Sequence, residues 1–116
     1  ITQSAFFHII RREKDKNNSM VKLVALYKAP ENKEEFMNKY ENEHLPLAKQ
    51  MPGLKKAEVY NINSLGGNKY FLCAELYFEN EDALNAAMAS PEGKAAAKNL
   101  MSFAKDYVEM HIANLK

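Results

Sequence analysis

The sequence contains a single cysteine, no strong excess of either charge and no long apolar run. With only Cys73, the chain can build neither an internal disulfide framework nor a cysteine-based zinc site, and a reducing, cytoplasmic setting is the simplest interpretation. A net charge of +1, without a basic cluster interleaved with aromatics, argues against nucleic-acid binding. The apolar runs are too short to cross a bilayer. The length of 116 residues suits one globular domain with a modest core.

Glycine is also scarce, and no glycine-rich loop follows a strand-like segment and opens a helix. The pair Gly66-Gly67 lies in "NSLGGNK", which is typical of a hairpin tip. This argues against a Rossmann-type nicotinamide or flavin site. The three histidines, His8, His44 and His111, are too dispersed to suggest a metal site. We therefore expect neither a metal nor a cofactor.

Residues 1–19 differ from the rest of the chain. A short apolar patch, Ala5 to Ile10, precedes the polar run "RREKDKNNS", and strand-like sequence starts directly after Met20. This order of apolar and charged residues is not that of a secretory signal. We expect Met20 to be the natural start and residues 1–19 to be an extension, so that residues 20–116 form the domain. The alternative is an arm that packs on the domain or on a partner subunit.

Alternating apolar residues and helix-start signals predict six elements after Met20. Strands are expected at 21–28, 54–62, 70–78 and 107–115, and helices from Asn32 to about His44 and from Asn80 to about Phe103. The order β-α-β-β-α-β is that of the ferredoxin-like arrangement. We therefore expect an α+β fold in which a four-stranded antiparallel sheet carries both helices on one face.

The first helix raises a question about its end. Phe36, Tyr40 and His44 recur every four residues and therefore share one helix face. Pro46 disfavours helical geometry at Leu45, so the regular helix is expected to end near His44. The residues "LAKQM" are expected to add one further turn before a Pro-Gly pair breaks the chain.

The strand at 21–28 is apolar on both faces. Ala25 and Tyr27 lie on one face, and Val24 and Leu26 lie on the other. A strand of this kind is covered on both sides. Because the helices cover only one side, we expect a homodimer that packs two such sheets face to face into a barrel.

Three stretches of the sequence stand out together: "EFMNKYENEHLPLAKQMPGL", "AELYF" and "SPEGKAAAKNLMSFA". They resemble the EthD family of small dimeric α+β barrel proteins. The resemblance covers about residues 20–115. Its motif positions are Tyr40, His44, Pro46, Leu47, Pro52, Gly53 and Leu54, followed by Ser90, Pro91, Glu92, Gly93, Phe103 and Ala104.

The resemblance implies a ferredoxin-like protomer and a barrel-forming homodimer. The wider superfamily includes cofactor-free monooxygenases, lactone isomerases, polyketide cyclases and haem-degrading enzymes. The chain has no tryptophan, a residue typical of the haem-degrading branch, so haem binding ranks low among the expectations. Relatives usually carry an aspartate where this chain has Asn99, and an asparagine at that position would hold a charged histidine less strongly.

His44 is the strongest candidate for a catalytic residue. A free imidazole titrates near neutral pH, which suits proton transfer. A position at a helix C-terminus would favour its protonated form. Tyr40, one turn earlier, could donate a hydrogen bond to a carbonyl or an oxyanion. The alternative is that His44 only packs and caps the helix.

Other residues are candidates for contact with a small-molecule ligand: Phe36, Tyr27, Tyr60 and Asn99. Glu75 lies in an apolar strand, where a carboxylate is costly unless it is paired. It is either a second acid or base, or the partner of a lysine from a neighbouring strand at the dimer interface. Cys73 is expected to be a small buried apolar side chain and not a nucleophile.

Two classes of function remain open. In the first, the protein is a cofactor-independent enzyme that carries out proton-transfer or oxidation chemistry on a small hydrophobic oxygenated compound. In the second, it is a non-catalytic dimer that binds or carries such a molecule. His44 is central to the first class, because it is the residue that would transfer the proton.

Overall fold

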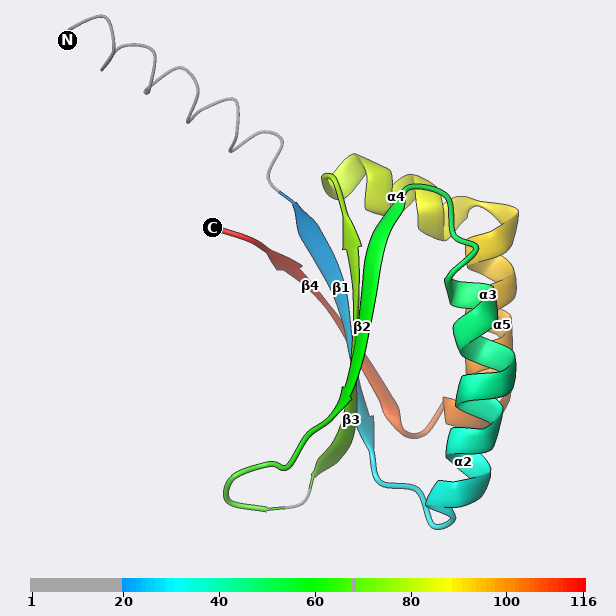
Figure 1. Cartoon of the computed structure of the whole chain (residues 1–116), viewed down its shortest axis with the longest axis vertical. Coiled ribbons are helices and arrows are strands. Elements are labelled where there is room, and N and C mark those ends of the chain that lie inside the picture. Colours follow the sequence, from blue (N-terminus) through cyan, green and yellow to red (C-terminus); the bar gives the residue numbers. More distant parts are fainter. Residues whose placement is uncertain (1–19, 68) are drawn as a thin grey trace, which may run out of the picture.

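Four strands form one antiparallel sheet in the order β2-β3-β1-β4, and the helices all lie over one of its faces (Figure 1). The computed structural model describes residues 20–67 and 69–116, so the hypothesis about residues 1–19 lies outside the described residues. The strands are β1 (Val21–Lys28), β2 (Leu54–Asn61), β3 (Tyr70–Phe78) and β4 (Val108–Asn114). The expected α+β, ferredoxin-like fold is confirmed.

The helical layer is built from two stretches of the chain. The first contains α2 (Lys33–Lys39), η1 (Tyr40–His44) and α3 (Leu45–Ala48), and the second contains α4 (Glu81–Ala89) and α5 (Pro91–Ala104). Side-chain caps start the helices as the sequence predicts. Asn32 and Asn80 each accept a hydrogen bond from the third backbone N–H that follows, and Ser90 does the same for α5.

The regular helix was expected to end near His44 with one further turn after it; the further turn is present, but the expected end of regular α geometry is wrong. Regular α geometry stops earlier, a wider π turn carries Tyr40–His44, and α3 continues to Ala48. In the π turn the Leu45 N–H bonds to the Tyr40 carbonyl, five residues back. Pro46 has no N–H, and its ring clashes with the carbonyl four residues back in an α-helix. The wider turn changes that register and lets the helix pass the proline.

The sheet has a helix-side face and an open face. In β1 the helix-side residues Val21, Leu23, Ala25 and Tyr27 are buried, whereas Val24 and Leu26 on the open face are half-buried. The alternation that the sequence predicts for this strand is confirmed.

Alternation fails at one end of β3. It predicts Phe71 on the same face as Cys73, but the register with β1 shifts between Tyr27 and Lys28. Phe71 instead packs on the helix side, with its ring centroid 5.7 Å from that of Phe36. A β-bulge of this kind reverses the face of the residues beyond it.

Alternation in the edge strand β4 predicts that Met110 and Ile112 share a face that points into the core. They pair with Ala25 and Leu23 of β1, so they belong to the helix-side face. Met110 is nevertheless 44% exposed and Ile112 is also exposed. The reason is position, because β4 is an edge strand with a neighbour on one side only.

Candidate functional site

A small cavity lies between the sheet and the segment formed by η1 and α3. Its walls are mostly aliphatic, and they include Leu23 and Leu76 from the sheet and Leu45 from α3. Polar atoms are contributed by Tyr27, Tyr40 and His44. The cavity measures about 20 Å³, which is room for about one water molecule.

His44 is held in this wall by the π turn and is only 7% exposed. Burial lowers the pKa of the imidazole, and the Ala96 carbonyl and the Asn99 side chain partly oppose this by favouring the charged form. The expectation that a helix terminus favours the protonated form is therefore wrong, because the helix continues past His44 and burial dominates. The imidazole is neutral at neutral pH and can accept a proton.

Tyr40 lies beside the imidazole, and Tyr27 lies beside Tyr40 in the same cavity wall. The ring centroid of Tyr40 is 5.5 Å from that of His44 and 5.4 Å from that of Tyr27. Burial raises the pKa of Tyr40 to about 12. Burial, followed by the interaction with Tyr40, also raises the pKa of Tyr27. Both phenols therefore keep their protons at neutral pH and can act as hydrogen-bond donors.

Phe36 is a buried neighbour of this group and does not line the cavity. Its ring stacks on Tyr40 at 6.4 Å and meets Tyr27, Phe103 and Tyr107 edge to face. These contacts hold the Tyr40 ring in place on the side away from the cavity, since aromatic pairs prefer such geometries.

Asn99 approaches His44 from α5. Its Nδ2 donates a hydrogen bond of 3.2 Å to Oε1 of Glu43. Asn99 does not line the cavity, so the structure places it behind the histidine and not among the cavity-lining residues.

Tyr60 lies on the opposite face of the sheet from His44. It pairs with Cys73 in the register of β2 and β3 and is 42% exposed. Cys73 is buried, and burial raises the pKa of its thiol. The structure therefore does not bring Tyr60 together with His44, Tyr40 and Tyr27.

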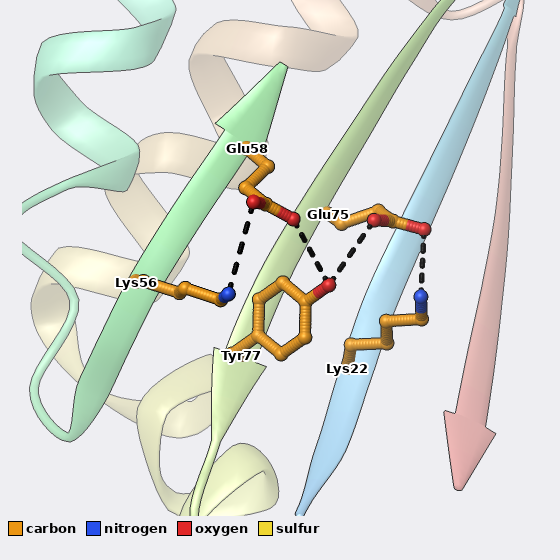
Figure 2. A network of polar contacts seen from close by, with 5 residues as sticks. All are labelled: Lys22, Lys56, Glu58, Glu75 and Tyr77. Carbon is orange, nitrogen blue, oxygen red and sulfur yellow. Dashed lines mark hydrogen bonds and ion pairs between the residues drawn. The ribbon is translucent and has the colours of Figure 1, made fainter. Parts of the chain in front are cut away.

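The open face also carries a network of paired polar groups (Figure 2). Lys22 donates to Glu75 at 2.8 Å, and the Tyr77 hydroxyl lies 3.3 Å from Glu75 and 3.0 Å from Glu58. Lys56 lies 3.7 Å from Glu58. Burial opposes ionisation of Glu75, but Lys22 and the neighbouring tyrosines outweigh it and lower the pKa of its carboxyl. The expected pairing of Glu75 with a lysine of a neighbouring strand is confirmed.

The other histidine among the described residues, His111, is exposed and lies 4.0 Å from Glu109. Across residues 20–67 and 69–116, no three histidine, cysteine or acidic side chains come together as a metal site. Within the same residues, no helix is long and apolar enough to cross a membrane.

Sequence reasoning missed three residues that shape the site. Leu45 reaches the cavity because the π turn rotates the helix after His44, and Pro46 was taken as the signal for a helix end and not for such a turn. Met110 could have been found from alternation, because it pairs with Ala25. Glu43 could not, since its partner Asn99 lies 56 positions away.

Comparison with known proteins gives close relatives along most of the chain. The EthD domain model matches residues 28–107. An uncharacterised 11.0 kDa protein of the thcB-thcC intergenic region of Rhodococcus erythropolis is 34% identical over 93 residues, which cover 78% of this chain and 90% of the relative.

Three solved structures extend this picture. An EthD family protein of Bacillus halodurans is 39% identical, with a TM-score of 0.80, over 84% of this chain and 99% of its own. A dimeric ferredoxin-like protein of unknown function from Bacteroides fragilis is 22% identical (TM-score 0.60; 83% and 96% covered). SnoaB, a cofactor-independent oxygenase of Streptomyces nogalater, is 14% identical (TM-score 0.57; 84% and 92% covered), and these two distant likenesses show the fold alone. The family match and the closer relatives show that the chain belongs to the EthD family.

Proposed function

We propose that this protein binds a small, mostly apolar molecule carrying an oxygen function in the His44 cavity and moves a proton on it without a cofactor. The observation that carries the proposal is a buried, neutral imidazole beside two tyrosines in a mostly aliphatic wall. Burying such a group costs stability unless it is hydrogen-bonded. Perturbed titratable groups of this kind concentrate at functional sites.

His44 and Tyr40 have different roles in the proposed reaction. The neutral imidazole takes a proton from an activated C–H or O–H group of the ligand and returns it at another atom. The Tyr40 hydroxyl, which stays protonated, donates a hydrogen bond to the carbonyl or developing oxyanion. Isomerisation and cyclisation need nothing more, and oxidation would take molecular oxygen as its co-reactant. The cofactor-independent oxygenase with the same fold supports this class of reaction.

Ligand entry requires the cavity to widen, because its present volume suits only about one water molecule. Met110 is the wall residue that is also exposed, so the cavity reaches the surface beside it. Methionine is unbranched and adapts its shape easily. Its displacement is the simplest route for a ligand to reach His44.

The experiment compares binding and turnover of neutral phenols, cyclic ketones and aldehydes in the native protein and in His44→Gln. The variant should lose turnover by roughly 10²–10⁴-fold, the usual contribution of a general acid or base. His111→Gln is the matched control, because that exposed histidine lies on the open face. Turnover that survives His44→Gln would contradict the proposal.

A non-catalytic binding protein is the second candidate. The observation in its favour concerns the residues that line the cavity. Among the described residues, His44 is the only one of them whose side chain ordinarily titrates near neutral pH, so no second acid or base of that kind assists it. Saturable binding in the native protein and in His44→Gln, with no turnover of any bound compound, would support this alternative.

We infer that the protein forms a homodimer through the open face of the sheet. Val24 and Leu26 are apolar there, and paired charges lie at both ends of the face, Lys22 with Glu75 and Lys28 with Glu109. The dimeric ferredoxin-like neighbour supports this assembly. Light scattering should give a dimer for the native protein and a monomer for Leu26→Glu, with Met88→Glu on α4 as a control that stays dimeric. A dimer that is unchanged in Leu26→Glu would contradict it.

A further inference from the structure

Two buried side-chain atoms of the described residues lack a hydrogen-bond partner, and they belong to neighbouring residues of the site. They are Nδ1 of His44 and Oδ1 of Asn99. Asn99 is also one of the two groups on α5 that act on the imidazole. Buried polar atoms are nearly always paired, so two unpaired atoms at one place require an explanation.

The orientation of the Asn99 amide is set by Glu43. An amide can be turned so that its oxygen and nitrogen exchange places, and ordinarily only the hydrogen-bond partners decide between the two orientations. Here Nδ2 donates to Oε1 of Glu43 at 3.2 Å, and an ionised carboxylate offers only acceptors. The NH₂ group therefore points toward Glu43, and Oδ1 is left for the buried side.

The two groups of α5 that face His44 are consequently both hydrogen-bond acceptors. One is the amide oxygen of Asn99 and the other is the backbone carbonyl of Ala96. Neither can donate a hydrogen to the ring. A ring nitrogen that faces α5 is stable only if it carries a hydrogen itself.

We propose that Glu43 and Asn99 act as positioning residues that fix the tautomer of His44, with Nδ1–H directed to Asn99 and the lone pair of Nε2 left free for the cavity. A small side-chain rotation closes the Nδ1–H to Oδ1 contact and satisfies both unpaired atoms. The order of groups is Glu43 carboxylate, Asn99 amide, His44 imidazole. The tautomer is independent of the proposed function, whereas its consequence for proton transfer rests on that function.

An asparagine suits this task better than an aspartate would. A carboxylate at position 99 would also accept from Nδ1–H, but its charge would favour the imidazolium and would lie beside Glu43. The neutral amide fixes the tautomer and leaves the imidazole able to accept a proton. The other groups around the ring, Tyr40 on its own segment and Tyr27 on the sheet, keep their protons at neutral pH.

The test reads the tautomer directly by nitrogen-15 NMR of the histidine rings in the full chain, without a ligand. The native protein should show His44 with its hydrogen on Nδ1. Asn99→Leu should shift the population toward the Nε2–H form that free imidazole favours. Asn99→Asp should keep Nδ1–H and raise the His44 pKa by about one unit or more.

Two further variants separate orientation from packing. Glu43→Gln, which can donate as well as accept, should weaken the tautomer preference, whereas Glu41→Gln, an exposed change within the same turn, should leave it unchanged. An Nε2–H tautomer in the native protein would overturn the proposal, as would an unchanged Nδ1–H population in Asn99→Leu. A confirmed tautomer with no turnover of any compound would leave this inference standing and refute only the proposed function.

Discussion

The two sides of the sheet differ in how their polar side chains are paired. On the open face, charged and hydroxyl groups are numerous and paired, as in the network of Lys22, Glu75 and Tyr77 (Figure 2). On the helix side, His44 is buried and Asn99 is half-buried, and each has one buried side-chain atom without a hydrogen-bond partner. Paired groups on the open face serve stability and association, whereas on the helix side a buried imidazole lines a cavity, where its Nε2 is free for a ligand in the proposed tautomer. The contrast places the candidate chemistry on the helix side.

The largest difference between the faces should appear in core stability. Phe36→Ala removes a ring that contacts several other aromatic residues, and it should lower the free energy of unfolding by about 3–5 kcal/mol. The matched change on the open face, Tyr60→Ala, affects a side chain that is already 42% exposed and should cost less than half as much. Urea unfolding at one protein concentration measures both. Equal losses would show that the two faces are equally packed.

The next effect concerns the ion pair on the open face. Lys22→Met leaves Glu75, only 8% exposed, without its charged partner, and it should cost about 1–3 kcal/mol at neutral pH. Lys56→Met is the control, because Lys56 and its partner Glu58 are both exposed and such pairs contribute about 1 kcal/mol or less. If the two variants were equally stable, the Lys22 pairing would have no special role.

The smallest effect is a difference in pH dependence between the faces. The pKa of Glu75 is lowered in the fold, so its stabilisation is present above the ordinary value of 4.5 and is lost as the pH falls through the lowered pKa. The pKa of His44 is also lowered, so its contribution is complete above 6.5 and is lost as the pH falls through its own folded value.

Stability curves from pH 7.5 to 3 separate these two windows. His44→Gln should remove the loss that begins below pH 6.5, and Glu75→Gln should remove only the loss at more acidic pH. His111→Gln is the control for the upper window. A native curve that is flat between pH 7 and 5 and identical to that of His44→Gln would contradict a buried neutral imidazole.

Much of the fold could be predicted because its signals are local. The caps at Asn32, Asn80 and Ser90 and the alternation in β1 depend only on neighbouring residues, and the structure confirms them. The position of Phe36, Tyr40 and His44 on one helix face could also be predicted from the sequence, and all three side chains are buried.

The features that sequence could not supply depend on distant contacts. Pro46 is a local signal that regular α geometry is disturbed, but whether the helix ends or passes the proline through a π turn also depends on the packing of its buried face against the sheet. Tyr60 was grouped with Tyr27, but alternation alone does not say which face of β2 meets the helices. The exposure of Met110 follows from the edge position of β4, which is a property of the whole sheet.

The most direct test of the account is to find which face binds a small neutral ligand. The backbone and side-chain NMR signals of the full chain would be followed during titration with phenol and with cyclohexanone. The account predicts that the changes centre on His44, Tyr40 and Met110, and that Met110→Trp reduces them. Changes centred on Tyr60, Cys73 and Tyr77 instead, with the His44 signals unmoved, would contradict it.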